Sequence, residues 1–394
     1  METAKNPSLR GLPVVTGADR GIVTAASYEA KALGILRGMP IFRVKKEFPS
    51  VRVLFGDYPA YVEYSGRVFD IVRRYADDVE EYSIDECFAD LTGLDRPLRM
   101  SYKEIAERVQ QEIWKELNLS VSIGVAPTKV LAKAASKWIK PGGLTVIDPV
   151  ADPTFYQHVL RTTPVDKVWG IGRQTSHFLR KKNIVTAEDF ANQERAWMKE
   201  HFSKPYGIIW YELNGASVLA VDPVPKTLYS SIQKTKTFHP PSSDANFLLS
   251  QISKHIEEAC AKARHYGLTA GKMSMFLKTR NFRYAFCPVP FAVSTNSPEI
   301  LMSHARREFP HIYNAGTLYR TAGVVLRDLV PMTAAQKDLF GGSAKADKFE
   351  AVHRQIDSLE YKLGKRVVHL ASTHEALKGE RVEELDLDRD LLFL

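Results

Sequence analysis

Apolar residues recur at helical spacing in several segments of this 394-residue chain. Between residues 61 and 75, in YVEYSGRVFDIVRRY, the positions Val62, Val68, Ile71 and Val72 share one face, which predicts an amphipathic helix. The same spacing predicts further helices around SYEAKALGI (27–35), over 103–117, over TKVLAKAASKWIK (128–140), near 244–266 and over the charged stretch 347–364. Residues 153 to 215 are expected to be entirely helical.

Alternating apolar positions predict strands elsewhere in the chain. In SVSIGVA, residues 120 to 126, Val121, Ile123 and Val125 alternate with smaller residues. Strands are also predicted in LPVVTG (12–17), VRVLFG (51–56), LTVID (144–148), SIQKTKTF (231–238) and KMSMFLKTR (272–280), with a hairpin in YSIDECFADL (82–91). Helices mixed with antiparallel strands predict an α+β fold. The segment 219–230, with two prolines and few periodic apolar residues, is expected to be a linker.

Composition narrows the class of protein. The chain is 44% hydrophobic, has no stretch apolar enough to span a bilayer, and begins with a polar segment unlike a secretory signal. Its three cysteines are too widely spaced to form a metal or disulfide framework, which fits a reducing cytoplasm. Residues 226 to 330 carry 14 Lys/Arg against 6 Asp/Glu, a local +8 that equals the net charge of the whole chain. This segment is the predicted polyanion-binding surface.

Two adjacent acids, Asp85 and Glu86, interrupt the predicted hairpin. Successive strand residues point to opposite faces, so the two carboxylates can share a metal only if the chain turns there. One interpretation is a hairpin tip where both acids are solvated. The other is a site for Mg²⁺, which carboxylates and substrate phosphates hold during nucleotidyl transfer.

A row of lysines comes next in the chain, in TKVLAKAASKWIKPGG. Lys129, Lys133, Lys137 and Lys140 fall on one face of the predicted helix, and Lys140 directly precedes Pro141-Gly142-Gly143, where the helix must stop. Such a row beside a glycine turn suits a triphosphate. An amphipathic helix with a solvated basic face explains the same pattern.

Two further motifs are suggestive. In VDKVWGIGRQTSHFLRKKNI, Gly170-Ile171-Gly172 precedes an amphipathic stretch, as in a helix-hairpin-helix that binds a DNA phosphate through backbone N–H groups. A simple turn between helices is the alternative. Gln336-Lys337-Asp338-Leu339-Phe340 lies in a segment rich in Gly, Ser and Ala and is typical of a short peptide that docks in an apolar pocket.

Taken together, these motifs resemble the Y-family translesion DNA polymerases, most closely the DNA polymerase IV branch. The resemblance runs from about Asn6 to at least Phe340 and is most specific in NPSLRGLPVV, SYEAKALGILRGMP, YSIDECFADLTG, SIGVAPTKVLAKAASKWIKPGGL and VWGIG. It implies a right-hand polymerase with an α+β little finger. The implied boundaries are fingers and palm over 1–152, a thumb with the helix-hairpin-helix over 153–218, a linker over 219–228, the little finger over 229–330 and a tail over 331–394.

The resemblance also implies roles for single residues. Asp85 would bridge two Mg²⁺ ions and Glu86 would hold the catalytic one, while Tyr28, Lys31 and Lys140 would bind the triphosphate of a deoxynucleoside triphosphate. The family more often has arginine where Lys31 stands, and lysine lacks its bidentate fork. The segment around Met39 would lie over the nascent base pair. Lys278 and Arg280 would track the backbone of primer-template DNA, and Gln336–Phe340 would bind the sliding clamp.

One departure from the family pattern bears on activity. Family members begin with a strand carrying Asp-x-Asp-x-Phe-Phe-Ala, and in this chain Glu2 and residues 7–13 match the family positions just after that strand. We therefore expect the first metal-binding aspartate, the aromatic steric gate and a central palm strand to be missing before Met1. A GTG valine codon misread as the start, or a truly shortened gene, would each give this result.

Two classes of function remain open. The chain is either an error-tolerant DNA polymerase or a catalytically inactive scaffold that binds DNA and the clamp. A palm-fold nucleotidyl cyclase is a third alternative, disfavoured by the helix-hairpin-helix and the basic distal domain. We expect a monomer in the bacterial cytoplasm, associated with the nucleoid and not with a membrane.

Overall fold

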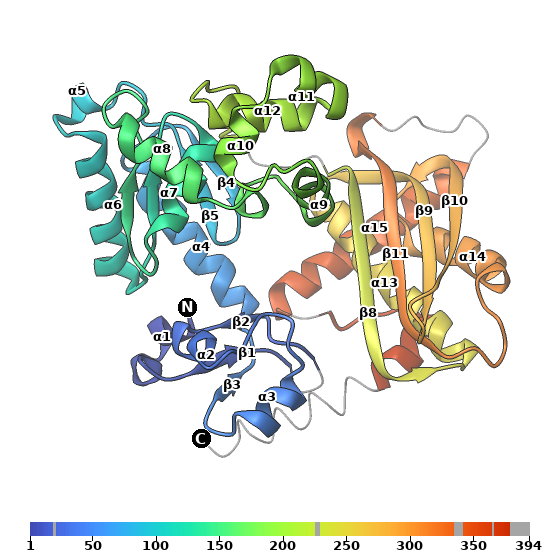
Figure 1. Ribbon diagram of the computed structural model, residues 1–394. Helices are drawn as coiled ribbons and strands as arrows, with labels where there is room; N and C mark the ends of the chain where they lie inside the picture. The colour runs from blue at the N-terminus through green and yellow to red at the C-terminus, as the bar shows by residue number, and fades with distance from the viewer. Residues whose placement is uncertain (19–20, 225–228, 335–341, 365, 379–394) are drawn as a thin grey trace. The chain divides into compact units, whose positions relative to one another are not determined.

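The computed structural model describes residues 1–18, 21–224, 229–334, 342–364 and 366–378 (Figure 1). The chain divides into two compact units, Met1–Pro225 and Lys226–Leu394, here called the N-terminal and C-terminal units. The division falls inside the segment 219–228 predicted as a linker. Among the described residues, no helix is long and apolar enough to cross a membrane.

The N-terminal unit opens with short strands and helices and ends in a run of helices. Its elements are α1 (Glu2–Lys5), η1 (Pro7–Leu9), β1 (Val14–Thr16), β2 (Ala25–Ala26), α2 (Tyr28–Ala32), α3 (Ile41–Glu47), β3 (Arg52–Leu54), α4 (Tyr58–Arg73), β4 (Val79–Ser83), β5 (Glu86–Ala89), α5 (Asp95–Leu98), α6 (Tyr102–Leu117), β6 (Ile123–Val125), α7 (Lys129–Trp138), β7 (Leu144–Val146), α8 (Pro153–Thr162), η2 (Val165–Lys167), α9 (Arg173–Lys181), α10 (Ala187–Ala191), α11 (Arg195–His201) and α12 (Lys204–Leu213).

Three small sheets organise this unit. β1 lies between antiparallel β2 and parallel β3, β4 pairs antiparallel with β5, and β6 pairs parallel with β7. Each sheet borders its own hydrophobic core. The core beside the first sheet contains Val15 and Ile41. The core beside the second sheet lies between α4, α6 and the β4–β5 pair. The core near the third sheet joins α7 to the helices from α8 to α12. The sheet that would carry catalytic groups is therefore held between two cores.

Local sequence explains where α6 begins, which of its faces is buried, and how closely α7 approaches β6. Ser101 begins α6 with a capping box, in which its hydroxyl accepts from the N–H of Glu104 and the Glu104 carboxylate accepts from the N–H of Ser101. Ile105, Val109 and Ile113 then recur at four-residue spacing and are buried. Gly124 of β6 allows α7 to approach closely, since a Cβ atom there would lie 2.1 Å from the carbonyl oxygen of Ala132.

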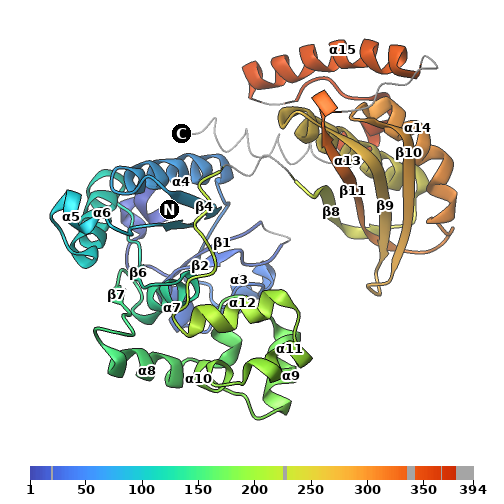
Figure 2. The same ribbon diagram turned by 90° about the horizontal axis from the view of Figure 1, so that it is seen from above.

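The C-terminal unit is a sheet with helices on one face. Its elements are β8 (Ser231–Ser242), α13 (Ala245–His265), β9 (Leu268–Thr279), β10 (Tyr284–Thr295), α14 (Pro298–Glu308), η3 (Phe309–His311), β11 (Tyr319–Pro331), η4 (Met332–Ala334), α15 (Gly342–Leu363) and η5 (Ala371–Thr373). The strands are antiparallel in the order β10-β9-β11-β8. Figure 2 shows α13 and α14 along one side of the strands and α15 on the far side of α13.

Residues 366–378, here called the C-terminal strap, lie along α13 through polar groups. The buried carboxylate of Glu257 accepts hydrogen bonds from the Thr373 hydroxyl and from the N–H of Leu370, the latter at 3.0 Å. The hydroxyl of Ser253 lies 2.9 Å from that of Thr373, and Ser250 accepts from the N–H of Ala376 at 2.8 Å. The polar face of α13 is thus covered by the end of the described chain.

Most predicted elements are confirmed, with shifts at their ends. The helices expected over 61–75, 103–117, 128–140, 244–266 and 347–364 correspond to α4, α6, α7, α13 and α15, and 153–215 is helical apart from its turns. Val62 was placed on the buried face of its helix, but it is 50% exposed. Helices α3 and α14 and strands β2, β10 and β11 are among the elements that the apolar pattern does not predict.

Candidate active site

The adjacent acids lie at the tip of the β4–β5 hairpin. Ile84 and Asp85 form the turn, and Glu86 is the first residue of β5. Because the turn interrupts the alternation of the strands, the two carboxylates need not point to opposite faces. Asp85 is exposed, and the hydroxyl of Ser83 donates a hydrogen bond of 2.7 Å to its Oδ1. The structure therefore provides the turn that a shared metal site requires.

One face of this hairpin is turned toward α7. Glu86 forms an ion pair with Lys133, whose side chain is only 11% exposed, and Glu80 forms a buried ion pair with Lys129. The Lys129 Nζ also lies 5.2 Å from the centre of the Phe88 ring. Helix α7 thus delivers lysines from successive turns to two acids of the hairpin, as α7, β4 and β5 lie side by side in Figure 1.

The opposite face of the hairpin is apolar. Val79, Cys87 and Ala89 belong to the core formed by α4 and α6. Burial raises the pKa of the Cys87 thiol to about 11, with a further increase from the charge of Glu81 and an opposing effect from Arg73. The hairpin is consequently held from both faces, and its tip is open to solvent.

The predicted row of four lysines is only partly correct. Lys129 is buried against Glu80, so it is a structural residue and neither a triphosphate ligand nor part of a solvated face. Helix α7 ends at Trp138, which places Lys140 in the turn beyond the helix, where it is exposed. Partial burial, followed by the positive charge of Lys133, lowers the pKa of Lys137, and Glu86 opposes this effect. Lys137 and Lys140 remain available to an anion.

The other predicted triphosphate ligands lie on α2. Ser27 caps this helix, and the Lys31 Nζ lies 4.8 Å from the centre of the Tyr28 ring. Tyr28 is 48% exposed. Ala30 of α2 packs in the core of the first sheet, whereas the β4–β5 hairpin borders the core of α4 and α6. Met39 lies partly buried against the core of the first sheet. The structure therefore brings Asp85, Glu86 and Lys133 together, and Tyr28 with Lys31, as separate groups.

The glycine turn of VWGIG packs against the same hairpin. Trp169 lies 5.3 Å from Tyr82 and 5.3 Å from Phe88, measured between ring centres. Gly170-Ile171-Gly172 comes next, and α9 begins directly after Gly172, as predicted. The first helical part of the motif is only the short turn η2. DNA-phosphate binding here stays a prediction.

Buried Glu80 and Glu212 are two acids whose role the sequence did not predict. Glu212 is fully buried, and its carboxylate accepts from the N–H groups of Val130, Val218 and Leu219 at 3.3, 2.7 and 2.9 Å. Glu80 accepts from the N–H of Asp222 at 3.0 Å. Together they hold the start of the linker against α7 and β4. A strand acid and a helix acid give no sequence signal of such contacts, because both residue types are usually exposed.

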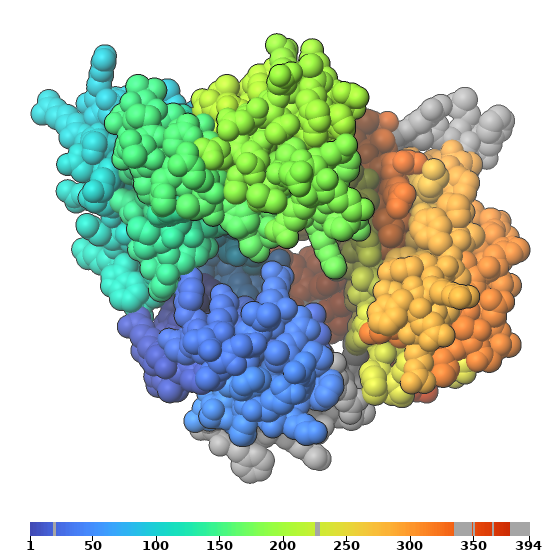
Figure 3. Space-filling view, viewed as in Figure 1, coloured from blue at the N-terminus to red at the C-terminus, as the bar shows by residue number. Residues whose placement is uncertain are grey.

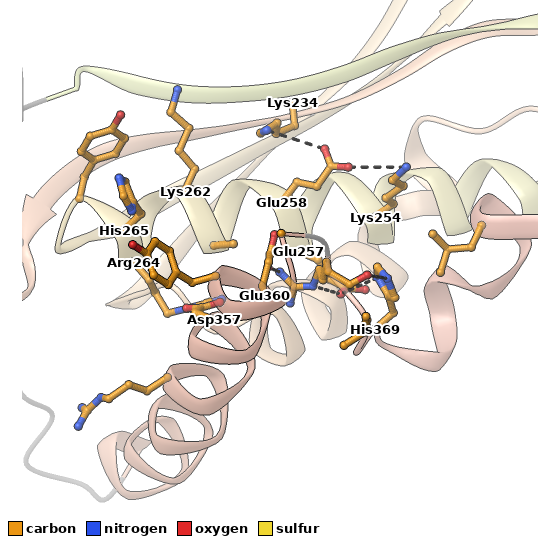
Figure 4. Close-up of a pocket in the computed structure, with 18 of the residues that line it drawn as sticks. Lys234, Lys254, Glu257, Glu258, Lys262, Arg264, His265, Asp357, Glu360 and His369 are labelled. Atoms are coloured by element: carbon orange, nitrogen blue, oxygen red, sulfur yellow. Dashed lines mark hydrogen bonds and ion pairs between the residues drawn. The ribbon is translucent and has the colours of Figure 1, made fainter. Parts of the chain in front are cut away.

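A cavity of about 1190 Å³ lies in the C-terminal unit, between α13, α15 and the C-terminal strap (Figure 4). Several of its charged groups form ion pairs. Glu258 lies 4.0 Å from Lys234 and 3.7 Å from Lys254, and Asp357 pairs with Arg264 at 2.6 Å. Arg366 lies 3.3 Å from Glu257. The pairs of Asp357 and Arg366 fasten α15 and the strap to α13, and we assign no catalytic role to the cavity.

Comparison with known proteins decides the family. Residues 1–137 match the impB/mucB/samB family, and residues 229–339 match the C-terminal domain of that family. DNA polymerase IV of Listeria monocytogenes serotype 4b is 31% identical over 275 residues, which cover 68% of this chain and 75% of that protein. The chain belongs to the Y-family of DNA polymerases.

Other relatives cover more of this Y-family chain. DNA polymerase IV 1 of Bacillus subtilis strain 168 is 29% identical over 379 residues, covering 95% of this chain and 90% of that protein. Protein ImpB of Salmonella typhimurium is 28% identical over 397 residues, covering 98% and 92%. Among solved structures, the Y-family DNA polymerase chimera Dbh-Dpo4(243-245)-Dbh superposes with a TM-score of 0.70 at 24% identity, covering 84% of this chain and 95% of that one. The fold is thus that of a right-hand polymerase with a little finger.

Proposed function

We propose that this protein is a template-directed, error-tolerant DNA polymerase that adds deoxynucleoside monophosphates to a primer during DNA damage tolerance. The observation that carries the proposal is the tip of the β4–β5 hairpin, where Asp85 and Glu86 stand beside a lysine-bearing helix. Membership of the Y-family, whose relatives are named DNA polymerase IV, supports it.

The hairpin tip suits magnesium. Its donors are carboxylate oxygens, Asp85 is exposed, and the Glu86 side chain keeps 38% of its surface accessible. Mg²⁺ in polymerase sites is usually held by one or two carboxylates together with substrate phosphates and water, and Asp85 and Glu86 would be the two carboxylates that this chain supplies. Asp85 would contact both ions and Glu86 one. When bound, the two ions supply charge neutralisation of the triphosphate and of the departing pyrophosphate.

The basic residues would position the incoming nucleotide. Lys140, in the turn after α7, and Tyr28 with Lys31, on α2, would bind the triphosphate of a deoxynucleoside triphosphate. The primer 3′-hydroxyl then loses its proton to solvent as its oxygen forms a bond to the α-phosphorus, and the bond from that phosphorus to the bridging oxygen of pyrophosphate breaks. The charges of the lysines stabilise the negative charge that develops on the leaving group.

The C-terminal unit would supply contacts outside the active site. Lys278 and Arg280 lie at the end of β9 and would contact the phosphates of primer-template DNA. The clamp peptide Gln336–Phe340 lies outside the described residues, and its binding to the sliding clamp rests on its sequence. A monomer working on chromosomal DNA in the bacterial cytoplasm fits these roles.

A second candidate is a polymerase-like scaffold that binds DNA and the clamp without synthesis. One observation favours it. Within the part of the chain that the structure describes, no group of three or more His, Cys, Asp or Glu side chains could hold a metal. Glu86 is moreover already paired with Lys133.

Primer extension with Asp85→Asn separates the candidates. We expect extension to fall on the order of a hundredfold or more, while affinity for primer-template DNA stays unchanged, because the C-terminal unit and not the hairpin binds the duplex. Asp78→Asn, an exposed acid before β4, is the control and should extend normally. Extension by Asp85→Asn within tenfold of the unchanged protein would show that Asp85 is not the metal ligand. DNA binding without any extension by the unchanged protein would favour the scaffold.

A further inference from the structure

Three aromatic side chains protrude at the end of the β9–β10 hairpin. Phe282, Tyr284 and Phe286 are 61%, 62% and 49% exposed. On β10, Tyr284 and Phe286 alternate with Ala285 and Cys287, which pack against the core beneath the sheet. The rings of Tyr284 and Phe286 therefore stand on the face of the sheet opposite α13 and α14, the face seen in yellow and orange in Figure 3, and Phe282 lies in the turn just before them. Large exposed rings grouped in this way commonly mark a binding surface.

The backbone at Phe282 adds an independent indication. Its φ is +66°, in the left-handed region that bulky residues rarely occupy and that glycine or asparagine usually fills in turns. The turn is closed by the N–H of Phe282 donating to the Thr279 carbonyl at 3.0 Å and by the N–H of Thr279 donating to the Arg283 carbonyl at 2.9 Å. Backbone strain of this kind clusters at functional sites, so the strain at Phe282 points to a function for its exposed ring.

Cations surround the rings without acidic partners. The Lys278 Nζ lies 4.8 Å from the ring centres of both Phe282 and Tyr284, and the Arg320 guanidinium lies 4.5 Å from that of Phe282. In the described portion of the chain, neither of these cations nor Arg280 or Arg283 forms an ion pair. Residues 259–298 contain six Lys/Arg and no Asp or Glu. The surface therefore carries positive charge that is available to an anionic ligand.

The buried ring of Phe276 packs beneath the exposed rings of this surface. Phe276 of β9 lies directly opposite Phe286 of β10 and Gly323 of β11. A Cβ atom on Gly323 would come within 2.3 Å of the Phe276 ring, so only glycine allows the ring to lie flat across the next strand. Tyr284 rests against Phe276 with ring centres 5.7 Å apart. The exposed rings are thus held in place from below.

We propose that this surface, formed by Phe282, Tyr284, Phe286 and Lys278, binds single-stranded DNA by stacking unpaired bases on its rings. Rings and cations together are the combination that binds single strands, with stacking on the bases and charge on the phosphates. A duplex offers its phosphates but not the faces of its bases, so duplex binding explains the cations and leaves the rings without a role. The proposal deepens the proposed function and rests on it for the identity of the strand, the unpaired template beyond the primer.

The test compares three fluorescent ligands on the full chain by anisotropy at one salt concentration. They are a short oligothymidylate, an abasic oligomer of the same length, and a blunt duplex. The variants are Tyr284→Thr/Phe286→Thr, which keeps good strand formers, and Phe282→Gly, which relieves the backbone. Tyr361→Ala, which removes a 90% exposed ring of α15, is the control.

We expect the unchanged protein to prefer the oligothymidylate to the abasic oligomer. The double variant should lose on the order of tenfold in affinity for the oligothymidylate and less than about twofold for the other two ligands, since stacking requires bases. Phe282→Gly should bind oligothymidylate more weakly without melting at a lower temperature. Equal affinity of the unchanged protein for both single strands, or an equal loss for all three ligands, would overturn the proposal. The binding assay contains neither nucleoside triphosphate nor metal, so failure of polymerase activity cannot imitate either result.

Discussion

The ammonium group of Lys133 pairs with the carboxylate of Glu86, the residue that follows Asp85 at the tip of the β4–β5 hairpin. One turn earlier on α7, Lys129 pairs in the same way with Glu80. The repulsion expected between adjacent acids is therefore reduced before any cation arrives. A divalent cation at Glu86 has to compete with a lysine that belongs to the same site.

Replacing Lys133 by methionine should make the site easier to fill with metal. Removing a competing charge worth about 1 kcal/mol corresponds to about a fivefold lower Mg²⁺ concentration for half-maximal binding. Calorimetric titration with Mg²⁺ or Mn²⁺ measures the change directly, without nucleotide or extension. Lys115→Met, an exposed lysine on α6, is the matched control. A higher or unchanged metal requirement in Lys133→Met would contradict the competition.

The pair between Lys129 and Glu80 should matter for stability. Both side chains are nearly buried, at 9% and 11% exposure, so Lys129→Met leaves a carboxylate without its partner. We expect the free energy of unfolding in urea to fall by about 3–5 kcal/mol. The double variant Glu80→Gln/Lys129→Met should recover much of the loss, since glutamine still accepts from the N–H of Asp222. A single variant as stable as the unchanged protein would show that the pair contributes nothing.

Alkylation of Cys87 should depend steeply on pH. Burial raises the pKa of this thiol to about 11, so at pH 8 only about one thiol in a thousand is a thiolate, the reactive form. Because the folded pKa lies above the usual value, the rate with iodoacetamide should increase about tenfold per pH unit until the pH approaches 11. Mass spectrometry of the Cys87 peptide measures the rate, with a short cysteine peptide as reference. A rate that levels off near pH 8.5 would mean an unperturbed thiol.

Replacing Leu339 and Phe340 by alanine should remove binding to a bacterial sliding clamp and leave extension without the clamp intact. Each side chain would bury apolar surface worth on the order of 2–3 kcal/mol. Surface plasmon resonance on immobilised clamp gives the dissociation constant. Lys337→Ala, in the same peptide, is the control and should bind nearly as well. An unchanged dissociation constant for the double variant would exclude this peptide as the clamp ligand.

Periodicity was sufficient for most elements of the fold. The helices α4, α6, α7 and α13 carry long amphipathic patterns, and tertiary packing reinforces what the pattern favours. The pattern also missed long strands, because β10 contains Pro288 and Pro290 and β11 is a nearly continuous buried run without alternation. Other missed elements are short. β2 has two residues and α3 has seven, too few for either period to emerge. Val62 has the spacing of a core residue and is exposed, because α4 extends beyond the core at its N-terminal end.

The site was predictable in its acids and less so in its lysines. The Asp-Glu pair at a hairpin tip follows from strand length and turn position. Lys129 and Lys133 share one helix face in the sequence, yet one is buried against Glu80 and the other reaches Glu86. Which acid meets which lysine depends on the register of β4 against β5 and on the approach of α7. Neither quantity is encoded in the spacing of the lysines alone.

The strap on α13 has a consequence for how the C-terminal unit opens. Its attachments to α13 are hydroxyl groups, backbone N–H groups and the Arg366 guanidinium, which pairs with the carboxylate of Glu257. All of these are polar groups that water can solvate once the strap is released. Release of the strap exposes little apolar surface beyond Leu370 and Ala376, so it need not accompany global unfolding. Amides of residues 370–376 should therefore exchange with solvent by local opening, faster than those of β9 and β11. The strap can therefore detach from α13 while the rest of the C-terminal unit stays folded.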